Sequence, residues 1–297
     1  MAQSLERLTH RTATMQSIRG IVRTMKTMSA INAAPYEQAA RSIDAWRQTV
    51  LDGLHAFIQH HGSLVADRSR VARKVLIVVG SDHGLCGNYN ELLAVEAARH
   101  FTSGRTVLVL CVGAKMQGAL AGEGITVATT LLPPANADGL NRLADELVTQ
   151  LEPHRTSAGS GGIAVTLVYT QRDRHGHQGP VSQDLLPLDA QMLRDLARRP
   201  WRSRSLPQFG LPAPELLAAL IRNLLFATLY RAAAEALLTE NAARLARMQQ
   251  AEQSVDEKLE DLHSETRSVR QTQITTELLD VIVGFEALGS RRATPPS

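Results

Sequence analysis

The sequence has few of the features that define several common classes of protein. It contains 2 cysteines, Cys86 and Cys111, which excludes a disulfide framework and suits a reducing compartment. Aromatic residues make up 4% of the chain, which favours helix-on-helix packing over a β-sandwich. The 32 basic residues barely exceed the 29 acidic ones, and a net charge of +3 does not indicate a nucleic-acid-binding surface.

Long apolar runs and a leader segment are missing as well. No uninterrupted apolar run approaches the roughly 18 residues that a membrane span needs. The N-terminus carries arginine but no apolar segment of the kind found in secretory signals. What is present is a hydrophobic content of 44% over 297 residues, which is enough to bury a large core. These features predict a soluble, intracellular chain.

The first third of the chain has the spacing of an amphipathic helix. Between Gln3 and Ala34 the one glycine or proline is Gly20. Apolar residues recur close to the three- and four-residue spacing of a helix stripe, at Leu5, Leu8, Met15, Ile18, Val22, Met25 and Met28. Pro35 is expected to kink or interrupt this helix, because proline removes one helical hydrogen bond and clashes with the preceding turn. A second helical stretch is expected from Tyr36 to Gln59.

The central region changes to the pattern of a sheet. Val75 to Val79 is a β-branched run closed by Gly80, as in a buried parallel strand. Further strands are expected at Thr106–Val112, Ile125–Thr129 and Ile163–Thr170, separated by helical stretches at Glu91–Phe101, Lys115–Ala121 and Gly139–Leu151, with exposed loops at 158–162 and 173–179. Strands that alternate with helices predict a small α/β layer built from right-handed crossovers.

The last third has no glycine or proline from Glu215 through Val283. As one helix this stretch is roughly 100 Å long, which predicts a projecting shaft. Met248, Val255, Leu262 and Val269 recur every seven residues, and Leu245 and Leu259 each precede one of them by three. This is the narrow seam of a coiled coil.

Beyond the seam the helix becomes apolar in nearly every direction. The residues are Ile274, Leu278, Leu279, Val281, Ile282, Phe285 and Leu288. A helix that is apolar all round must be enclosed. The chain has one other long helix, at its N-terminus, to cover this tip. We therefore expect the tip to lie in a sleeve made by other proteins.

Three motifs together resemble the γ subunit of F-type ATP synthases, the central rotor shaft. They are Ile21–Ala30 in the N-terminal helix, Ser81–Asn90 after the first central strand, and a C-terminal set. The C-terminal set comprises Glu240–Arg244, Arg270–Gln271, Ile274–Thr275 and 277–288. The motifs lie in the family's order and spacing at both ends and in the middle of the chain.

The resemblance implies an antiparallel coiled coil of the two terminal helices with a central Rossmann-like α/β domain. The expected boundaries are 1–72 for the N-terminal helix region, 73–213 for the α/β domain, 214–288 for the C-terminal helix and 289–297 for a disordered tail. The implied partners are the α and β subunits as an α3β3 hexamer, the ε subunit and the membrane c-ring. No cofactor, metal or catalytic residue is expected. The implied location is peripheral, on the cytoplasmic face of a bacterial inner membrane.

The resemblance also implies roles for individual residues. Arg244, Gln271 and Thr275, with Arg270 beside them, would make polar contacts to loops of β. Met25, with Arg23 and Lys26 nearby, would face an acidic lever loop of β. The apolar bearing would hold Ile274, Leu278, Leu279, Ile282 and Phe285. From the residues alone, the polar positions would be read as a solvated helix face.

The sequence departs from the family at Ile31–Glu37, where the usual basic stretch is replaced, and at His83 and Asn88. It resembles a divergent bacterial member, with the alternate N-type branch as one candidate.

Two other functions stay open at this point. The turn that contains Gly80, Gly84 and Gly87 could bind a phosphate-bearing ligand in a standalone α/β enzyme, although it matches neither standard phosphate-loop motif. A coiled-coil scaffold that homodimerises is the other alternative.

His83 and Cys86 have ligand-like spacing but lack the four ligands of a structural zinc site. His175 and His177 are expected to be solvated, and the basic run from Arg194 to Arg204 is expected to be a hydrated linker.

Overall fold

The computed structural model describes residues 2–62, 64, 73–101, 107–157, 162–173, 175–201 and 203–292. The chain forms two compact units, one made of Met1–Thr27 with Ala246–Ser297 and the other of Met28–Leu245. We call them the terminal unit and the central unit. Two long helices, α1 (Ala2–His61) and α6 (Ala213–Arg292), contribute residues to both.

The central unit contains a sheet of five strands in the order β3-β2-β1-β4-β5. The strands are β1 (Arg73–Val79), β2 (Val107–Val112), β3 (Thr129–Leu131), β4 (Ile163–Arg172) and β5 (Gln178–Leu186). β1 pairs in parallel with β2 and with β4, in a register that places Ile77 beside Leu110 and Leu167. β5 is antiparallel to β4. The valine- and leucine-rich inner strands of the sheet are nearly all buried, as parallel strands covered on both faces require.

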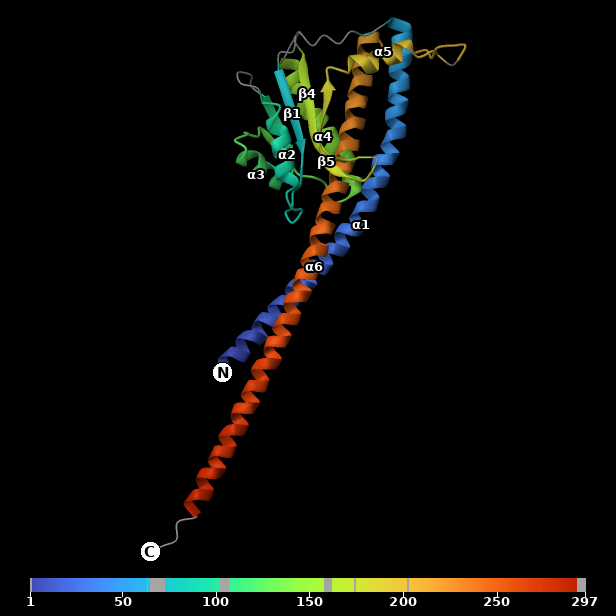
Figure 1. Ribbon diagram of the computed structural model, residues 1–297. Helices are drawn as coiled ribbons and strands as arrows, with labels where there is room; N and C mark the ends of the chain where they lie inside the picture. Colours follow the sequence, from blue (N-terminus) through green and yellow to red (C-terminus); the bar gives the residue numbers. More distant parts are fainter. Residues whose placement is uncertain are drawn as a thin grey trace. The chain divides into compact units, whose positions relative to one another are not determined.

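Helices cover both faces of this sheet (Figure 1). On one face, α2 (Tyr89–Ala98) and α3 (Ala114–Gly122) pack against alternate residues of the strands, such as Leu76 and Val78. On the other, α4 (Leu140–Ser157), which follows the short 3₁₀ turn η1 (Ala137–Gly139), packs with α1 and α6 against Val75, Ile77 and Val79. Because successive side chains of β1 point to opposite faces of the sheet, alternate residues belong to the two halves of the core.

Within the central unit, α1 and α6 run antiparallel. Asp44 pairs with Arg231 at 2.9 Å, and a Cβ at Gly53 would lie 3.0 Å from Leu220 Cδ2. The residue numbers therefore rise on one helix as they fall on the other. At Gly53 the helices approach so closely that an added Cβ would require Leu220 to shift by a few tenths of an ångström. Near this contact, α5 (Ala190–Arg198) packs Leu193 and Leu196 against Leu54 and Ile58 of α1.

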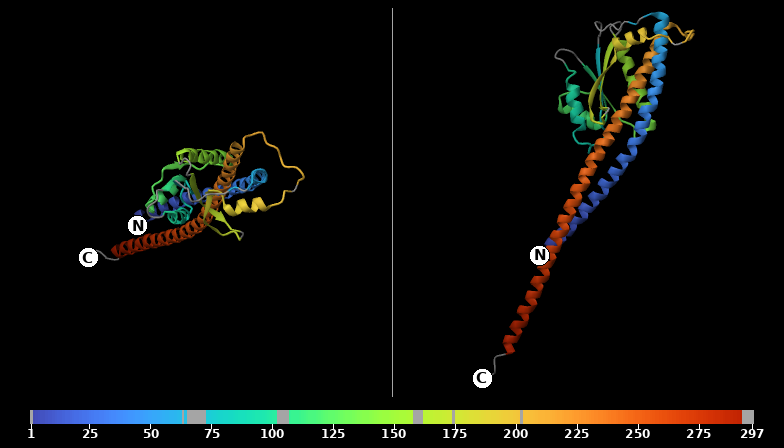
Figure 2. Two further views of the ribbon diagram at one scale, coloured as in Figure 1. Left: turned by 90° about the horizontal axis from the view of Figure 1, so that it is seen from above. Right: turned by 45° about the vertical axis from the view of Figure 1, so that its right-hand side comes forward.

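The terminal unit is a second antiparallel pairing of the same two helices, visible as neighbouring segments in both views of Figure 2. Arg19 pairs with Asp256 at 2.6 Å and Arg23 with Glu252 at 2.8 Å, so the pairing again runs in opposite directions. The apolar seam is buried at Leu8 and Val22 of α1 and at Met248, Leu259 and Leu262 of α6. Val255 and Val269 of the predicted seam are half-buried. The predicted architecture, a coiled coil of terminal helices with a central α/β domain, is confirmed.

Several local predictions need correction. Of the kink or interruption expected at Pro35, the interruption is wrong, because α1 is continuous from Ala2 to His61. The lost hydrogen bond and the steric clash cost about 3 kcal/mol, and burial of the adjacent Tyr36 and Ala40 in the core offsets that cost. The expected strand at Ile125–Thr129 is displaced to Thr129–Leu131, and Ile125 is buried from a loop instead.

Two elements were not anticipated, β5 and α5. β5 holds a glycine and a proline, Gly179 and Pro180, and α5 has 9 residues, so neither carries a long regular pattern. Helix α6 also extends to Arg292, past the predicted end at residue 288, while 293–297 lie outside the described residues. The predicted loop at 158–162 likewise lies outside them except for Gly162.

Among the described residues, one helix, within Ala213–Phe285, is long and apolar enough by composition to cross a membrane. It contains no uninterrupted apolar run of the kind considered above, and 33% of its most apolar window is buried inside the fold. Core helices of soluble proteins meet the same criterion. Buried residues such as Leu229, Ala233 and Leu237 place this part of α6 in the core of the central unit.

Candidate partner-contact surfaces

The C-terminal part of α6 exposes the apolar residues that the sequence singled out. The exposed fractions of Ile274, Leu278, Leu279, Ile282 and Phe285 range from 45% to 79%. Val281 and Val283 are exposed as well, at 70% and 63%. Large apolar groups on successive turns and several sides of one helix are unusual on a monomer's surface and mark an interaction site. The side chain of Leu288 lies outside the described residues.

Polar candidates lie just before this apolar segment. Arg270, Gln271 and Thr275 are all exposed. The Thr275 hydroxyl donates to the Gln271 carbonyl at 2.9 Å, a bond along its own helix that leaves the Gln271 amide side chain out of the contact. These three residues are placed where a partner that surrounds the helix end would meet them.

The cationic candidates on α1 are held by the chain itself. Glu252 accepts hydrogen bonds from Arg23 Nε at 2.8 Å and from Lys26 Nζ at 2.5 Å. These bonds from Lys26 and then Arg23 hold the pKa of the Glu252 carboxyl below its usual range. Met25, between them, is half-buried. Arg23 keeps its side chain exposed at 53%, so it can meet an additional acidic group while paired to Glu252.

Arg244 is bound more completely than the other candidates. It forms an ion pair with Glu240 one turn earlier on α6, and its side chain is 11% exposed. Its Nε and Nη2 also donate to the carbonyls of Gly84 and His83, both at 3.4 Å. Of the candidates on α6, Arg244 is thus the one that contacts the central unit's Ser81–Asn90 loop.

The loop has the contacts of a structural turn. Asn90 donates to the Ser81 hydroxyl at 2.7 Å and accepts from the Ser81 backbone N–H at 2.9 Å. Asp82 accepts from the Ala114 backbone N–H at 3.0 Å, which caps the start of α3. The glycine at Gly113 adopts a φ of +101°, and a Cβ there would lie 2.4 Å from the Ser81 carbonyl oxygen. Two of the glycines at this turn have structural reasons: a Cβ at Gly80 would lie 2.4 Å from Met116 Sδ, and Gly87 adopts a φ of +69°.

No group of three or more histidine, cysteine or acidic side chains that could hold a metal ion occurs among the described residues. Cys86 is buried against Ser81, and burial raises the pKa of its thiol. Burial raises the pKa of Cys111 to about 12. The side chain of His83 is 82% exposed beside Asp82. His175 and His177 face Asp173, whose carboxylate accepts their backbone N–H groups at 2.8 and 2.9 Å.

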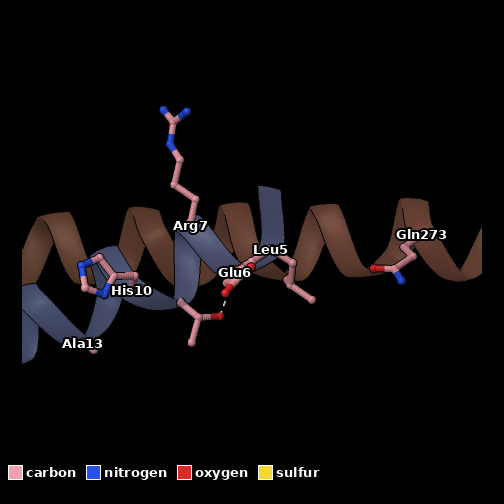
Figure 3. Close-up of a pocket in the computed structure, with 7 residues that line it drawn as sticks. Leu5, Glu6, Arg7, His10, Ala13 and Gln273 are labelled. Atoms are coloured by element: carbon pink, nitrogen blue, oxygen red, sulfur yellow. Dashed lines mark hydrogen bonds between the residues drawn. The ribbon is translucent and has the colours of Figure 1, made fainter. Parts of the chain in front are cut away.

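An open hollow of about 820 Å³ lies on the terminal unit (Figure 3). It is lined by one turn after another of α1 and by Gln273 of α6; the lining residues are Leu5, Glu6, Arg7, Thr9, His10, Ala13 and Gln273. Arg7 points away from α6 in this view. The hollow is wide and shallow and gathers no convergent set of polar groups, so it resembles a surface for another chain more than a ligand site.

Sequence reasoning missed the polar groups buried along α6 opposite the sheet. The Tyr89 hydroxyl donates to the Ala236 carbonyl at 2.9 Å and lies 3.2 Å from the Thr239 hydroxyl. Glu235 accepts from Arg172 Nε at 3.1 Å. In a sequence, a glutamate or threonine in a helix is normally read as a surface residue, which is why these groups were missed. The one signal of their burial is the run of small residues Ala232–Ala234, which lets another element approach the helix closely.

Comparison with known proteins decides the family. A family model described as ATP synthase matches residues 4–288. The chain belongs to the ATP synthase γ-chain family. It is 29% identical over 301 residues to the ATP synthase gamma chain of Granulibacter bethesdensis, with 96% of this chain and 99% of that one covered. It is 27% identical over 295 residues to that of Methylobacterium nodulans, with the same coverage.

Solved structures agree on the fold. The chain matches one in the OSCP/F1/c-ring part of the Euglena gracilis mitochondrial ATP synthase with a TM-score of 0.65 and 16% identity, over 100% of this chain and 98% of that one. The alternatives of a standalone enzyme and a homodimeric scaffold are not favoured. In addition, the antiparallel pairing of α1 with α6 fills the seam that a homodimer would need.

Proposed function

We propose that this chain is the rotating central stalk of an F-type ATP synthase and carries no catalytic site of its own. It would couple ion flow through a membrane c-ring to ATP synthesis or hydrolysis in an α3β3 hexamer, with an ε subunit bound beside it. The observation that carries the proposal is the exposed apolar end of α6, from Ile274 to Phe285, in a chain that matches the γ-chain family from residue 4 to 288.

The physical basis is a difference in contacts around a ring. Two unequal helices present different side chains in different directions, so three equivalent catalytic subunits around them meet three different surfaces. Each surface favours a different conformation of the subunit that touches it, and therefore a different nucleotide affinity. Rotation exchanges the surfaces, so each site passes through every state in turn.

Exposure supports the roles proposed for individual residues. Ile274, Leu278, Leu279, Ile282 and Phe285 would turn inside an apolar bearing, where contact is non-directional and can slide. Arg270, Gln271 and Thr275 would make polar contacts with loops of β just below the bearing.

Cationic residues would serve a separate contact. Arg23 and Lys26, beside Met25, would attract an acidic segment of β. Exposed ion pairs contribute about 0–1 kcal/mol, so such contacts break readily at each step. Arg244 would add a polar contact from the donors that it keeps at the surface.

The location proposed is peripheral, on the cytoplasmic face of a bacterial inner membrane, reached through the complex. The bacterial origin of the relatives from Granulibacter bethesdensis and Methylobacterium nodulans supports it.

Truncation of α6 tests the coupling role. A chain that ends at Glu265 loses the apolar end and Gln271 but keeps the buried seam residues Leu259 and Leu262. Assembled with α, β and ε subunits and the membrane sector, it should hydrolyse ATP with little ion-driven synthesis. The matched control is a chain that ends at Arg292, which should couple normally. Full ion-driven synthesis by the chain that ends at Glu265 would refute the proposal.

A further inference from the structure

The loop from Ser81 to Asn88 is tied to three neighbours at once. Asn90 holds its first residue, Asp82 caps α3, and Arg244 reaches its middle from α6. The first two contacts come from the elements that flank the sheet. The third comes from α6, more than 150 residues further along the chain, and it is the contact that joins the loop to the long helix.

The Arg244 contact is built from a buried charge pair. Glu240 is 5% exposed and lies one helical turn from Arg244, whose guanidinium then spans two successive carbonyls, His83 and Gly84. A planar guanidinium presents five donors in a rigid fork and can hold a carboxylate and backbone oxygens together, whereas the ammonium of lysine offers three donors from a single nitrogen. Burial raises the pKa of Glu240, and the neighbouring Arg244 charge works against that rise.

The residue that follows these carbonyls has an unusual backbone. Leu85 adopts a φ of +66°, and no other non-glycine residue among those described has a positive φ. Its side chain is 60% exposed, so burial of the side chain does not account for the conformation. Leucine in this region carries a conformational cost and persists where its surroundings fix the backbone. Here the Ser81 hydroxyl donates to the His83 carbonyl at 2.9 Å, and Arg244 donates to the His83 and Gly84 carbonyls, both at 3.4 Å.

We propose that Glu240 and Arg244 form a latch, a pair of positioning residues that fixes the Ser81–Asn88 loop to α6 and holds Leu85 in its left-handed conformation. The latch makes the C-terminal edge of the sheet move with the long helix. This inference rests on contacts inside the central unit and does not depend on the proposed function.

The latch covers a natural reporter. Cys86 belongs to the loop and points inward: it is 4% exposed, and its thiol lies 3.5 Å from the Ser81 hydroxyl and 3.9 Å from the His83 carbonyl. Cys111 is fully buried in β2 and serves as an internal control. Opening of the loop should therefore expose one thiol and leave the other covered.

The experiment measures the reaction rate of each thiol with an aromatic disulfide reagent in the isolated full-length chain. In Arg244→Gln we expect Cys86 to react about 10- to 100-fold faster, since the variant removes charge-assisted bonds to the loop. Loss of the Arg244 charge would by itself raise the Cys86 pKa and slow the thiol, so acceleration reports opening. The Cys86 reaction rate of Arg244→Lys should lie between those of the wild type and Arg244→Gln.

Matched variants complete the test. Arg222→Gln removes an exposed arginine of the same helix and should leave both thiols protected. Cys86→Ser identifies which thiol reacts. An unchanged Cys86 rate in Arg244→Gln, with Cys111 still protected, would overturn the latch and leave Arg244 to partner contacts alone. If Cys111 also becomes reactive in Arg244→Gln, the whole fold has opened, and Arg244→Lys then provides the test. In Arg244→Lys with Cys111 still protected, a Cys86 rate equal to wild type overturns the proposal. An intermediate Cys86 rate in that variant supports it.

Discussion

Cationic side chains on the two long helices differ in how much of their hydrogen-bonding capacity the chain already uses. Arg244 is committed to Glu240 and to loop carbonyls, and Arg23 and Lys26 share Glu252. Arg270 is exposed. This gradient separates residues that shape the chain from those available to another subunit, although all four carry the same charge.

Glu252 should make the helix pairing of the terminal unit sensitive to acid. Its folded-state pKa is lowered by Lys26 and Arg23, so its contribution to stability is present above the carboxyl's ordinary pKa and is lost as the pH falls through the lowered value. In Glu252→Gln that loss should disappear, with weaker pairing at neutral pH. Amide hydrogen exchange in residues 246–262 as a function of pH measures the stability of the helix pairing. Glu260→Gln, at an exposed position of the same helix, should keep the wild-type profile.

Leu85 offers a prediction about backbone strain. Asparagine tolerates the left-handed region better than leucine, and the exposed side chain of Leu85 contributes little burial. We expect Leu85→Asn to raise the unfolding free energy of the isolated chain by about 0.5–1 kcal/mol. Urea denaturation gives the value. A loss of more than that amount would mean that the leucine side chain makes a stabilising contact in solution.

Helix α1 contains two glycines in opposite environments. A methyl group added at Gly20 would meet no neighbouring atom within 4 Å, whereas one added at Gly53 would meet Leu220 Cδ2 at 3.0 Å. Gly20→Ala should stabilise the isolated chain by about 0.5–1 kcal/mol, because alanine favours the helix. Gly53→Val should destabilise it by about 1–3 kcal/mol through overpacking. Thermal unfolding of the two variants provides the comparison, and equal shifts would contradict the close approach of α1 and α6.

The seam between the helices is the other element that a single substitution can break. Leu262 is 2% exposed, and Leu262→Asp would bury a charge at a cost of several kcal/mol if it stays unpaired. We expect failed assembly of the complex, measured by co-purification with α and β subunits. Ser264→Asp, two residues away at an exposed position, should assemble normally. Normal assembly of Leu262→Asp would contradict the seam.

Elements with long regular patterns could be predicted from the sequence, and short or irregular ones could not. The strands around Val75–Val79 and Ile163–Thr170 were found because buried parallel strands read as continuous apolar runs. The strand β5 was missed because an edge strand with Gly179 and Pro180 lacks such a run. Helix α1 passes through Pro35 because packing by Tyr36 outweighs a local preference. The exposed end of α6 was predictable, whereas the buried partners of Arg244 depend on contacts between distant residues.

For the molecule as a whole, the apolar end of α6 should separate folding from function. Leu278 and Phe285 are exposed at 58% and 79%, so the fold does not depend on them. The double variant Leu278→Gln with Phe285→Gln should leave thermal unfolding of the isolated chain unchanged and make it less prone to aggregate. In the assembled complex it should reduce ion-driven ATP synthesis several-fold. A variant that couples normally would argue against an apolar bearing.

The terminal unit joins the first 27 residues to residues from Ala246 onward, and this has a consequence for biosynthesis. Arg19 cannot meet Asp256 until the ribosome has made everything between them. At a translation rate of about 5–20 residues per second, the nascent N-terminal helix remains unpaired for some ten seconds to nearly a minute before its partner segment of α6 is made. During that interval the apolar face of the N-terminal helix is accessible to chaperones, and the central unit has time to fold first.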